Sequence, residues 1–244
     1  MPATHENLAP LKSAVRCTAL LLAVSTAASA YQEVAVQSGG TIRGRISFSG
    51  RPPAPRPAPV TKDAAVCGKM RDSDAFLLSK DGGVANVVVY LLQVPAGKPW
   101  KDDGQPVLDQ QGCHYLPHVQ IVREHATLLV RSSDPILHNV HSFLNGASVI
   151  NLAMPARKGV AIKQRLDKPG GMQLKCDVHA FMRGGIFVAT NPYAALTGPD
   201  GSYTIEDVPP GQYTIASWHE EAGPISDVIT VPPSGAVEWN GRVR

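Results

Sequence analysis

The sequence predicts an all-β fold, and three features carry this prediction. Of its 244 residues, 22 are glycine and 21 are proline, proportions that suit short strands joined by turns. After the N-terminal leader, no long stretch repeats its apolar residues at the helical period. Alternating apolar and polar positions recur instead, and hydrophobic residues make up 43% of the chain, enough for a packed core.

Residues 1–30 have the pattern of a secretory signal peptide. Lys12 and Arg16 precede the apolar run 17–24, and small residues suited to cleavage end at Ala30. The alternative is a membrane anchor, but the run is well short of the ~20 residues that a spanning helix needs. We therefore expect cleavage after Ala30, a periplasmic or secreted mature protein, and no later membrane span.

The first part of the mature chain contains two clear strand patterns. Residues 40–50 alternate apolar and polar side chains, and residues 84–92 form a β-branched run typical of a central strand. Between them, residues 51–59 contain five prolines in nine positions. That composition fits either an extended polyproline segment over a sheet edge or a flexible linker. Residues 31–39 are expected to form a strand and a turn.

The second part contains more strand patterns and its own turn signature. Polar, turn-rich residues 95–112 mark a boundary. Predicted strands follow at residues 113–122, 126–130, 160–166, 171–176 and 185–189. Near the end, two Tyr-Thr-Ile segments flank the Pro-Pro-Gly sequence 209–211, which predicts a β-hairpin.

The cysteine count bears on both disulfide bonding and metal binding. Removal of the leader leaves Cys67, Cys113 and Cys176, and two of them are expected to pair in an oxidising compartment. Three pairings are possible, and Cys67–Cys113 is the only one that leaves Cys176 free. The odd count agrees with a metal thiolate at Cys176 without establishing one.

The candidate functional site is the spacing C-x2-H-x2-M formed by Cys176, His179 and Met182. A thiolate, an imidazole and a weak thioether are the donors that a blue-copper site takes from one loop. Such a site needs a second imidazole, and residues 134–141, which hold two histidines, offer one. Structural zinc fits less well because it has no use for the thioether.

Simpler interpretations exist for each of these residues. A buried cysteine is usually inert packing, and Met182 could fill a core. His118 alternates away from Val119 and Ile121 and is expected at the surface, outside the site. The chain has no G-x-S-x-G motif and no Walker loop, so we expect no enzymatic activity. Its net charge of +3, with scattered Lys and Arg, does not indicate a nucleic-acid surface.

Residues 105–190 resemble the cupredoxins, most closely those of the amicyanin type. The resemblance rests on the motif 138–141, on the C-x2-H-x2-M spacing and on the run 181–184. It implies a Greek-key β-barrel or β-sandwich that binds one type 1 copper ion. The implied copper ligands are His138, Cys176, His179 and Met182.

The same resemblance assigns roles around the ligands. It implies that Asn139 ties the two ligand loops together. Independently of the resemblance, His141 lies three residues after His138, and we expect it to face solvent or to hydrogen-bond locally, outside the site. Leu137 departs from the pattern because amicyanins have proline there, and Asp177 adds a negative charge near the site.

The flanking regions resemble a carboxypeptidase-regulatory-like, or transthyretin-like, β-sandwich. The matching motifs lie in residues 40–92 and 198–215, on either side of the cupredoxin-like region. We therefore expect one discontinuous sandwich, residues 31–104 plus 191–244, with residues 105–190 inserted in it. A tandem arrangement is the alternative.

These observations predict an exported blue copper protein that carries single electrons between redox partners. We expect His179 to lie near the surface, with Ala180 and Phe181 forming a small apolar collar for docking. The resemblance implies an amine dehydrogenase and a c-type cytochrome as partners, as in methylamine utilisation. The alternative is a copper-storing or copper-delivering protein, or a module that binds a carbohydrate or protein without redox turnover.

Overall fold

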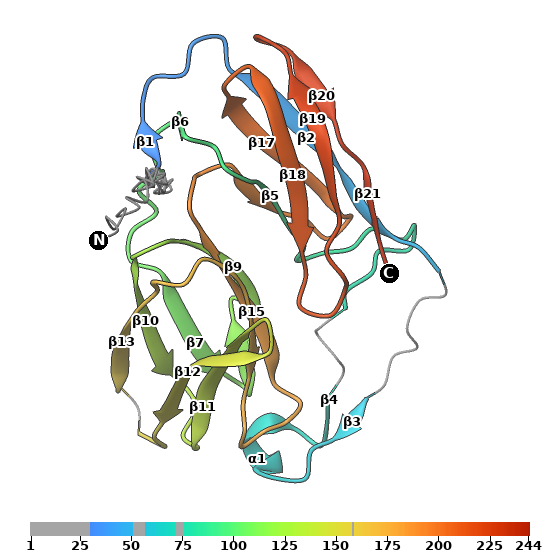
Figure 1. Cartoon of the computed structure of the whole chain (residues 1–244). Coiled ribbons are helices and arrows are strands. Elements are labelled where there is room, and N and C mark those ends of the chain that lie inside the picture. The colour runs from blue at the N-terminus through green and yellow to red at the C-terminus, as the bar shows by residue number, and fades with distance from the viewer. Residues whose placement is uncertain (1–29, 51–56, 72–75, 158) are drawn as a thin grey trace, which may run out of the picture.

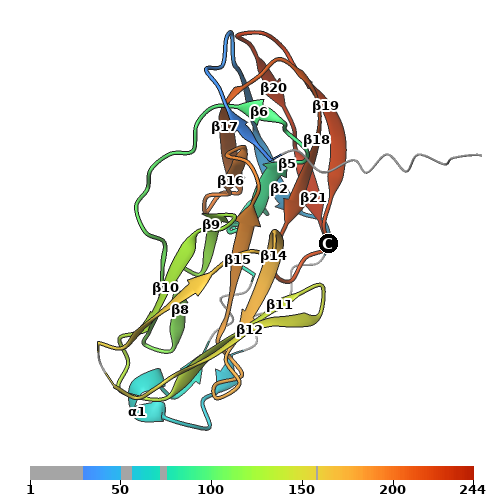
Figure 2. The same cartoon turned by 60° about the vertical axis from the view of Figure 1, so that its left-hand side comes forward.

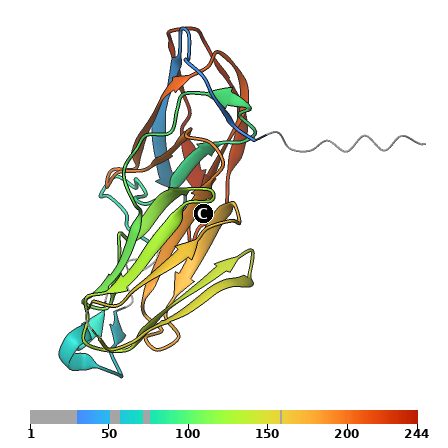
Figure 3. The same cartoon turned by 90° about the vertical axis from the view of Figure 1, so that its left-hand side faces the viewer.

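The structure is a computed structural model that describes residues 30–50, 57–71, 76–157 and 159–244. It confirms the all-β prediction, since α1 (Ala64–Cys67) is the one helix in these ranges. The strands form two β-sandwiches, which lie end to end in an elongated molecule (Figures 1, 2 and 3). None of the described helices is long and apolar enough to cross a membrane.

The first sandwich, in the upper part of Figure 1, combines strands from both ends of the chain. Its sheets have the orders β16-β5-β18-β19 and β17-β2-β20, and β21 also pairs with β2. The strands are β2 (Gly40–Phe48), β5 (Val88–Leu91), β16 (Ala194–Leu196), β17 (Ser202–Val208), β18 (Gly211–Trp218), β19 (Ser226–Val231), β20 (Ala236–Glu238) and β21 (Gly241–Val243). Ile42 and Ile46 of β2 and Ile215 of β18 are fully buried in the core between these sheets.

The second sandwich, in the lower part of Figure 1, is built from the chain between β6 and β16. Its sheets have the orders β13-β10-β7-β8 and β12-β11-β14-β15-β9. The strands are β7 (Val107–Gln111), β8 (His114–Leu116), β9 (Val119–Arg123), β10 (Thr127–Ser132), β11 (His138–Leu144), β12 (Ala147–Met154), β13 (Ala161–Arg165), β14 (Gly170–Lys175) and β15 (Arg183–Ala189). Alternate residues of each strand, such as Leu128 and Val130 of β10 and Met172 and Leu174 of β14, fill its core.

Residues 57–71, which we call the strap, leave the first sandwich and pack on the second. The strap contains β3 (Ala58–Pro59), α1 and β4 (Met70–Arg71), and it lies at the end of the second sandwich that is remote from the first (Figure 1). Cys67 belongs to the core of the second sandwich, and the partly buried Val60 and Val66 pack against that core. Of the three possible pairings, the structure has the Cys67–Cys113 disulfide, and Cys176 is a free cysteine.

A third apolar cluster joins the two sandwiches. Trp218 at the end of β18 packs on the outer face of β14 and β15, where Gly171 and Gly185 leave room for its ring. A Cβ added at Gly171 would lie 2.2 Å from the ring of Trp218. Phe187 contributes to the same cluster from β15. A small parallel pair, β1 (Gln32–Glu33) with β6 (Ala96–Gly97), lies beside the junction.

Several local predictions were wrong. The two Tyr-Thr-Ile segments do not pair with each other, because β17 pairs with β2 and β18 pairs with β5 and β19 in the opposite sheet. The strand expected over 113–122 is two strands, β8 and β9, in different sheets. The boundary region 95–112 contains β7, and β11 and β12 were not predicted.

Other predictions lie partly or wholly outside the described residues. The predicted signal peptide, residues 1–30, lies outside them except for Ala30, and residues 51–56 of the proline-rich segment are outside them too. The domain boundaries at residues 104 and 190 stay a prediction.

Candidate metal centre

Two neighbouring strands bring the predicted donors together. β11 and β14 are antiparallel partners, with His141 opposite Lys175. His138 is the first residue of β11, and Cys176 follows the last residue of β14, so both lie at the same end of the sheet. His179 is in the loop that connects β14 to β15. The register of one strand pair therefore places residues that are 38 positions apart side by side.

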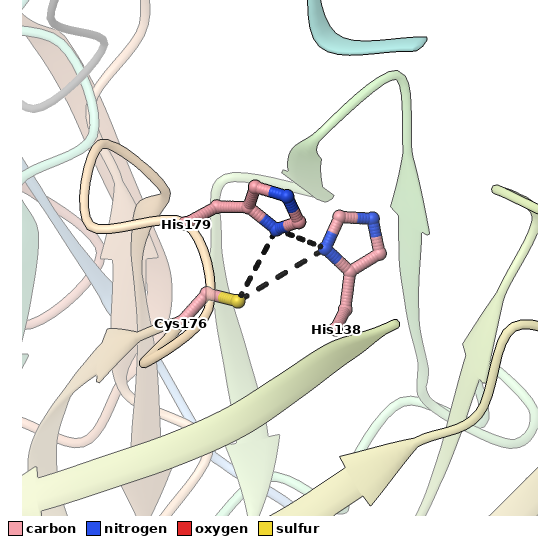
Figure 4. Close-up of side chains that lie close together, drawn as sticks. All are labelled: His138, Cys176 and His179. Atoms are coloured by element: carbon pink, nitrogen blue, oxygen red, sulfur yellow. Dashed lines mark hydrogen bonds between the residues drawn. The ribbon is translucent and has the colours of Figure 1, made fainter. Parts of the chain in front are cut away.

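The three donor atoms form a compact triangle (Figure 4). The Nδ1 atoms of His138 and His179 are 3.1 Å apart, and Cys176 Sγ is 4.0 Å and 3.8 Å from them, respectively. A circle through three such points has a radius of about 2.1 Å, which is the length of a metal–imidazole bond and slightly less than that of a metal–thiolate bond. The spacing fits a single metal ion.

The outer nitrogen of each imidazole is held by a carboxylate. His138 Nε2 is 2.9 Å from Asp134 Oδ2, and His179 Nε2 is 2.9 Å from Asp63 Oδ2. Because a carboxylate oxygen accepts, each Nε2–H donates, which leaves both Nδ1 atoms with a free lone pair. Carboxylates in this position fix the tautomer and orientation of metal-binding histidines.

Asp134 is itself fixed by the main chain. Its carboxylate accepts hydrogen bonds from the N–H groups of Gly112 and Cys113, at 2.7 and 2.8 Å. Burial lowers the pKa of His138 below its ordinary value, and the hydrogen bond to Asp134 opposes part of that shift. A lowered pKa favours the neutral imidazole, which is the form that binds a metal.

The neutral tautomers create an electrostatic demand at the centre of the triangle. In the neutral tautomers that direct both Nε2–H groups at the carboxylates, the two Nδ1 lone pairs face each other at 3.1 Å. The thiol of Cys176 points to the same place, and all three side chains are buried. A proton shared at this contact, or a metal cation between the three atoms, would remove the repulsion.

Met182 belongs to the same apolar core as Cys176. Its side chain is buried, and its backbone N–H donates to the carbonyl of His179 at 2.9 Å. This bond closes a tight turn in the loop that carries the predicted ligands. The assignment of Met182 as the axial ligand stays a prediction.

Asn139 connects the two ligand-bearing segments. Its side chain accepts from the N–H of Asp177 at 2.6 Å and donates to the Asp177 carboxylate at 2.8 Å, so it ties β11 to the loop after β14. His141 bonds locally, to Asp177 and to Ser148, and stays outside the triangle as expected. Its hydrogen bond lowers the pKa of Asp177, which keeps that carboxyl ionised.

Two expectations about histidines were wrong. His179 does not lie near the surface, because the strap covers it and it is only 1% exposed. His118 is not a surface histidine, because its side chain is largely buried and bonds to the carboxylate of Glu220 from the first sandwich. In both places, a segment that is distant in the sequence covers the residue.

Sequence reasoning missed both carboxylates that orient the histidines. Asp134 is four residues before His138, a spacing that could have suggested contact. Asp63 is 116 residues before His179, and no local pattern indicates it. Leu137, the residue in place of the expected proline, is 45% exposed beside His138.

Comparisons with known proteins find cupredoxins among the solved structures. No protein-family model matches the chain, and no curated protein sequence matches it. A reduced Cu(I) form of an amicyanin mutant is similar at 26% identity and a TM-score of 0.32, over 36% of this chain and 84% of that chain. A purple cupredoxin from Nitrosopumilus maritimus is similar at 16% identity and a TM-score of 0.31, over 35% and 100%. Amicyanin from Paracoccus versutus is similar at 20% identity and a TM-score of 0.32, over 36% and 83%.

Proposed function

We propose that this protein is an exported one-copper protein that carries single electrons. His138, Cys176 and His179 would hold the copper ion, and Met182 would be its weak axial ligand. The observation that carries the proposal is the buried triangle of one sulfur and two inward-facing Nδ1 atoms. Bound there, copper would supply a one-electron couple.

The chain's own contribution is a fixed ligand geometry. Each histidine is held at its outer nitrogen by a carboxylate, and Cys176 directly follows a central strand. Ligands on rigid strands with supported side chains move little, and a small change in geometry favours fast electron transfer. With Met182 as the axial ligand, this buried site would have no open position for a substrate, so we propose a carrier and not an enzyme.

The disulfide supports export. Cys67–Cys113 is the kind of bond that persists in an oxidising compartment, where Cys176 would stay reduced by binding the metal. We propose that residues 1–30 are the cleaved leader and that the mature protein is periplasmic or secreted. A redox protein, such as a dehydrogenase or a c-type cytochrome, would be its partner.

The pairing of β2 and β5 with strands that follow residue 193 supports the inserted arrangement. We propose that the first sandwich is the scaffold into which the copper-binding sandwich is inserted. Its core consists of aliphatic and aromatic side chains, and none of its described residues belongs to the metal-binding group.

One observation favours a second function, copper delivery. The imidazole edge of His179 is covered by the strap, whereas a carrier that exchanges electrons through this edge needs it close to a partner. A protein that stores copper and releases it to an acceptor benefits from such a closed site.

Copper binding is tested by adding Cu(II) to the purified, metal-free protein. We expect the intense blue charge-transfer band of a copper–thiolate, and we expect Cys176→Ala to abolish it. His141→Ala is the matched control, because His141 is a nearby histidine outside the triangle. Absence of the band in protein whose Cys176 is shown to be reduced would overturn the proposal.

Electron transfer and delivery are separated by a second measurement. Voltammetry of the copper-loaded protein should give a reversible one-electron wave, and the copper should stay bound through repeated cycles. Stoichiometric loss of copper to an acceptor protein or chelator, without a reversible wave, would favour delivery.

A further inference from the structure

The strap reaches the metal centre from the other sandwich and is fastened there by a covalent bond. Cys67 at the end of α1 is bonded to Cys113, in the turn between β7 and β8. Asp134, which orients His138, accepts the N–H of the same Cys113. The disulfide therefore joins the strap to the turn that supports one of the candidate ligands.

A second contact fastens the end of the strap. The guanidinium group of Arg71 hydrogen-bonds to the ring of His114 and to the carbonyl of Gly112. It also lies over the ring of Phe181, 5.9 Å from the centroid of that ring, and Phe181 is in the loop that carries His179. The strap is thus held both to the β7–β8 turn and to the ligand loop.

Asp63 has an unusual position and an unusual partner. It immediately precedes α1 and has a left-handed backbone, at φ 55°. An aspartate at the position before a helix normally accepts hydrogen bonds from the first free N–H groups of that helix. Its side chain makes no such cap, and Oδ2 accepts from His179 Nε2 instead. The one carboxylate that could cap α1 is thus used to hold His179.

We propose that the strap closes the metal centre and that Asp63 is the positioning residue for His179. The strap would hold Asp63 against Nε2, so that Nδ1 points at the metal and the imidazole edge is covered. This inference deepens the proposed function and rests on it for its redox consequence. Its closure of the site can be tested without any metal.

The charge of Asp63 gives the contact a chemical effect. A carboxylate bonded to a ligand imidazole makes that imidazole a stronger donor and places negative charge near the ion. Both effects favour the more positive oxidation state, Cu(II), over Cu(I). Asp63 should therefore lower the reduction potential of the centre.

The first experiment measures access to Cys176 in the metal-free protein. We expect slow alkylation by iodoacetamide in the mature wild-type protein, because Cys176 is 2% exposed. The double variant Cys67→Ala, Cys113→Ala unties the strap and leaves Cys176 as the single thiol, and alkylation should be about tenfold faster or more. Asp63→Ala should also increase the rate with the disulfide intact, and it serves alone if the double variant does not fold.

The second experiment isolates the charge. Asp63→Asn keeps an oxygen that can accept from His179 Nε2 but removes the negative charge. The ratio of Cu(II) to Cu(I) affinity should fall about tenfold, which is a rise of about 59 mV for a one-electron couple. Asp167→Asn is the matched control, because Asp167 bonds to His125 in an exposed pair away from the site.

The outcomes distinguish this inference from the proposed function. If the blue band forms but Asp63→Asn leaves the potential at the wild-type value, Asp63 does not act on the centre and its positioning role is overturned. If alkylation of Cys176 is equally fast in wild type, Asp63→Ala and the untied protein, the closure is overturned. If the strap controls alkylation but no blue band forms in wild type, the closure stands and the copper function fails.

Discussion

The two sandwiches use their buried polar groups in different ways. In the first, Asn191 and Thr197 bond to main-chain carbonyls, those of Leu91 and Val84, and so fasten one strand to another. In the second, one set of buried side chains is linked directly, from Asp134 through His138 to His179, and the two histidines turn a nitrogen to the same point. Burial alone does not distinguish the two sandwiches, whereas the direct contacts between the side chains around His138 do.

The sharpest test of this difference pairs one core residue from each sandwich. Leu174→Ala in β14 and Ile215→Ala in β18 each remove a fully buried side chain, and each should lower the free energy of unfolding by about 2–5 kcal/mol. Only Leu174→Ala should alter the copper–thiolate spectrum, because Leu174 is two residues before Cys176. Urea unfolding and the absorption spectrum measure the two effects, and an equal spectral change in both variants would contradict the division of roles.

A second test concerns the junction of the sandwiches at acid pH. His219 is buried beside Glu220, and its Nδ1 accepts the N–H groups of Glu221 and Ala222. Burial lowers the pKa of His219 to about 4 from 6.5, so the unfolded chain takes up a proton that the folded protein does not. The contribution of neutral His219 to the free energy of unfolding is complete above the unfolded pKa of 6.5. It is lost as pH falls from 6.5 to about 4, which lowers the free energy of unfolding by up to about 3 kcal/mol.

The variant His219→Asn isolates this effect, because an amide oxygen can accept the same N–H groups without titrating. Between pH 7 and pH 4, the free energy of unfolding should fall less in this variant than in wild type. The comparison is needed because burial raises the pKa of Glu220, which makes wild-type stability change in the opposite direction as pH falls. Identical pH profiles for both proteins would show that His219 does not titrate as inferred.

The smallest expected effect concerns the packing of one sandwich on the other. Gly171→Ala would place a Cβ 2.2 Å from the Trp218 ring, so the ring must move, at a cost of about 1–3 kcal/mol. Tryptophan fluorescence and thermal unfolding would report the change. Gly223→Ala is the control, because a Cβ there meets no atom within 4 Å. Unchanged fluorescence in Gly171→Ala would contradict the close packing.

Local sequence patterns were sufficient for the fold class and for two of the three converging donors, Cys176 and His179. Strand alternation and turn residues act over a few positions, so they predict β2 and β14 well. The ligand loop has the same advantage, since Cys176 and His179 are only three residues apart. The remaining donor, His138, was predicted from the resemblance to cupredoxins. The pairing of β11 with β14 explains why it lies beside Cys176.

Distant contacts account for what the sequence did not predict. The Pro-Pro-Gly turn after β17 gives the same local signal whether the chain returns to its own sheet or crosses to the opposite one. His118 was expected at the surface because nothing near it in the sequence indicates that Glu220 covers it. Asp63 was missed for the same reason, since only the folded strap brings it to His179.

The route of the strap has a practical consequence for protein engineering. A fragment consisting of residues 105–190 would contain every predicted copper ligand and look like an independent module. It would leave Cys113 without Cys67, remove Val60 and Val66, which pack against the core, and deprive His179 of its carboxylate. The smallest unit that keeps the complete centre therefore contains residues 57–71 as well as residues 105–190. Transferring the copper centre to another scaffold would require residues 57–71 as a second, disulfide-linked piece.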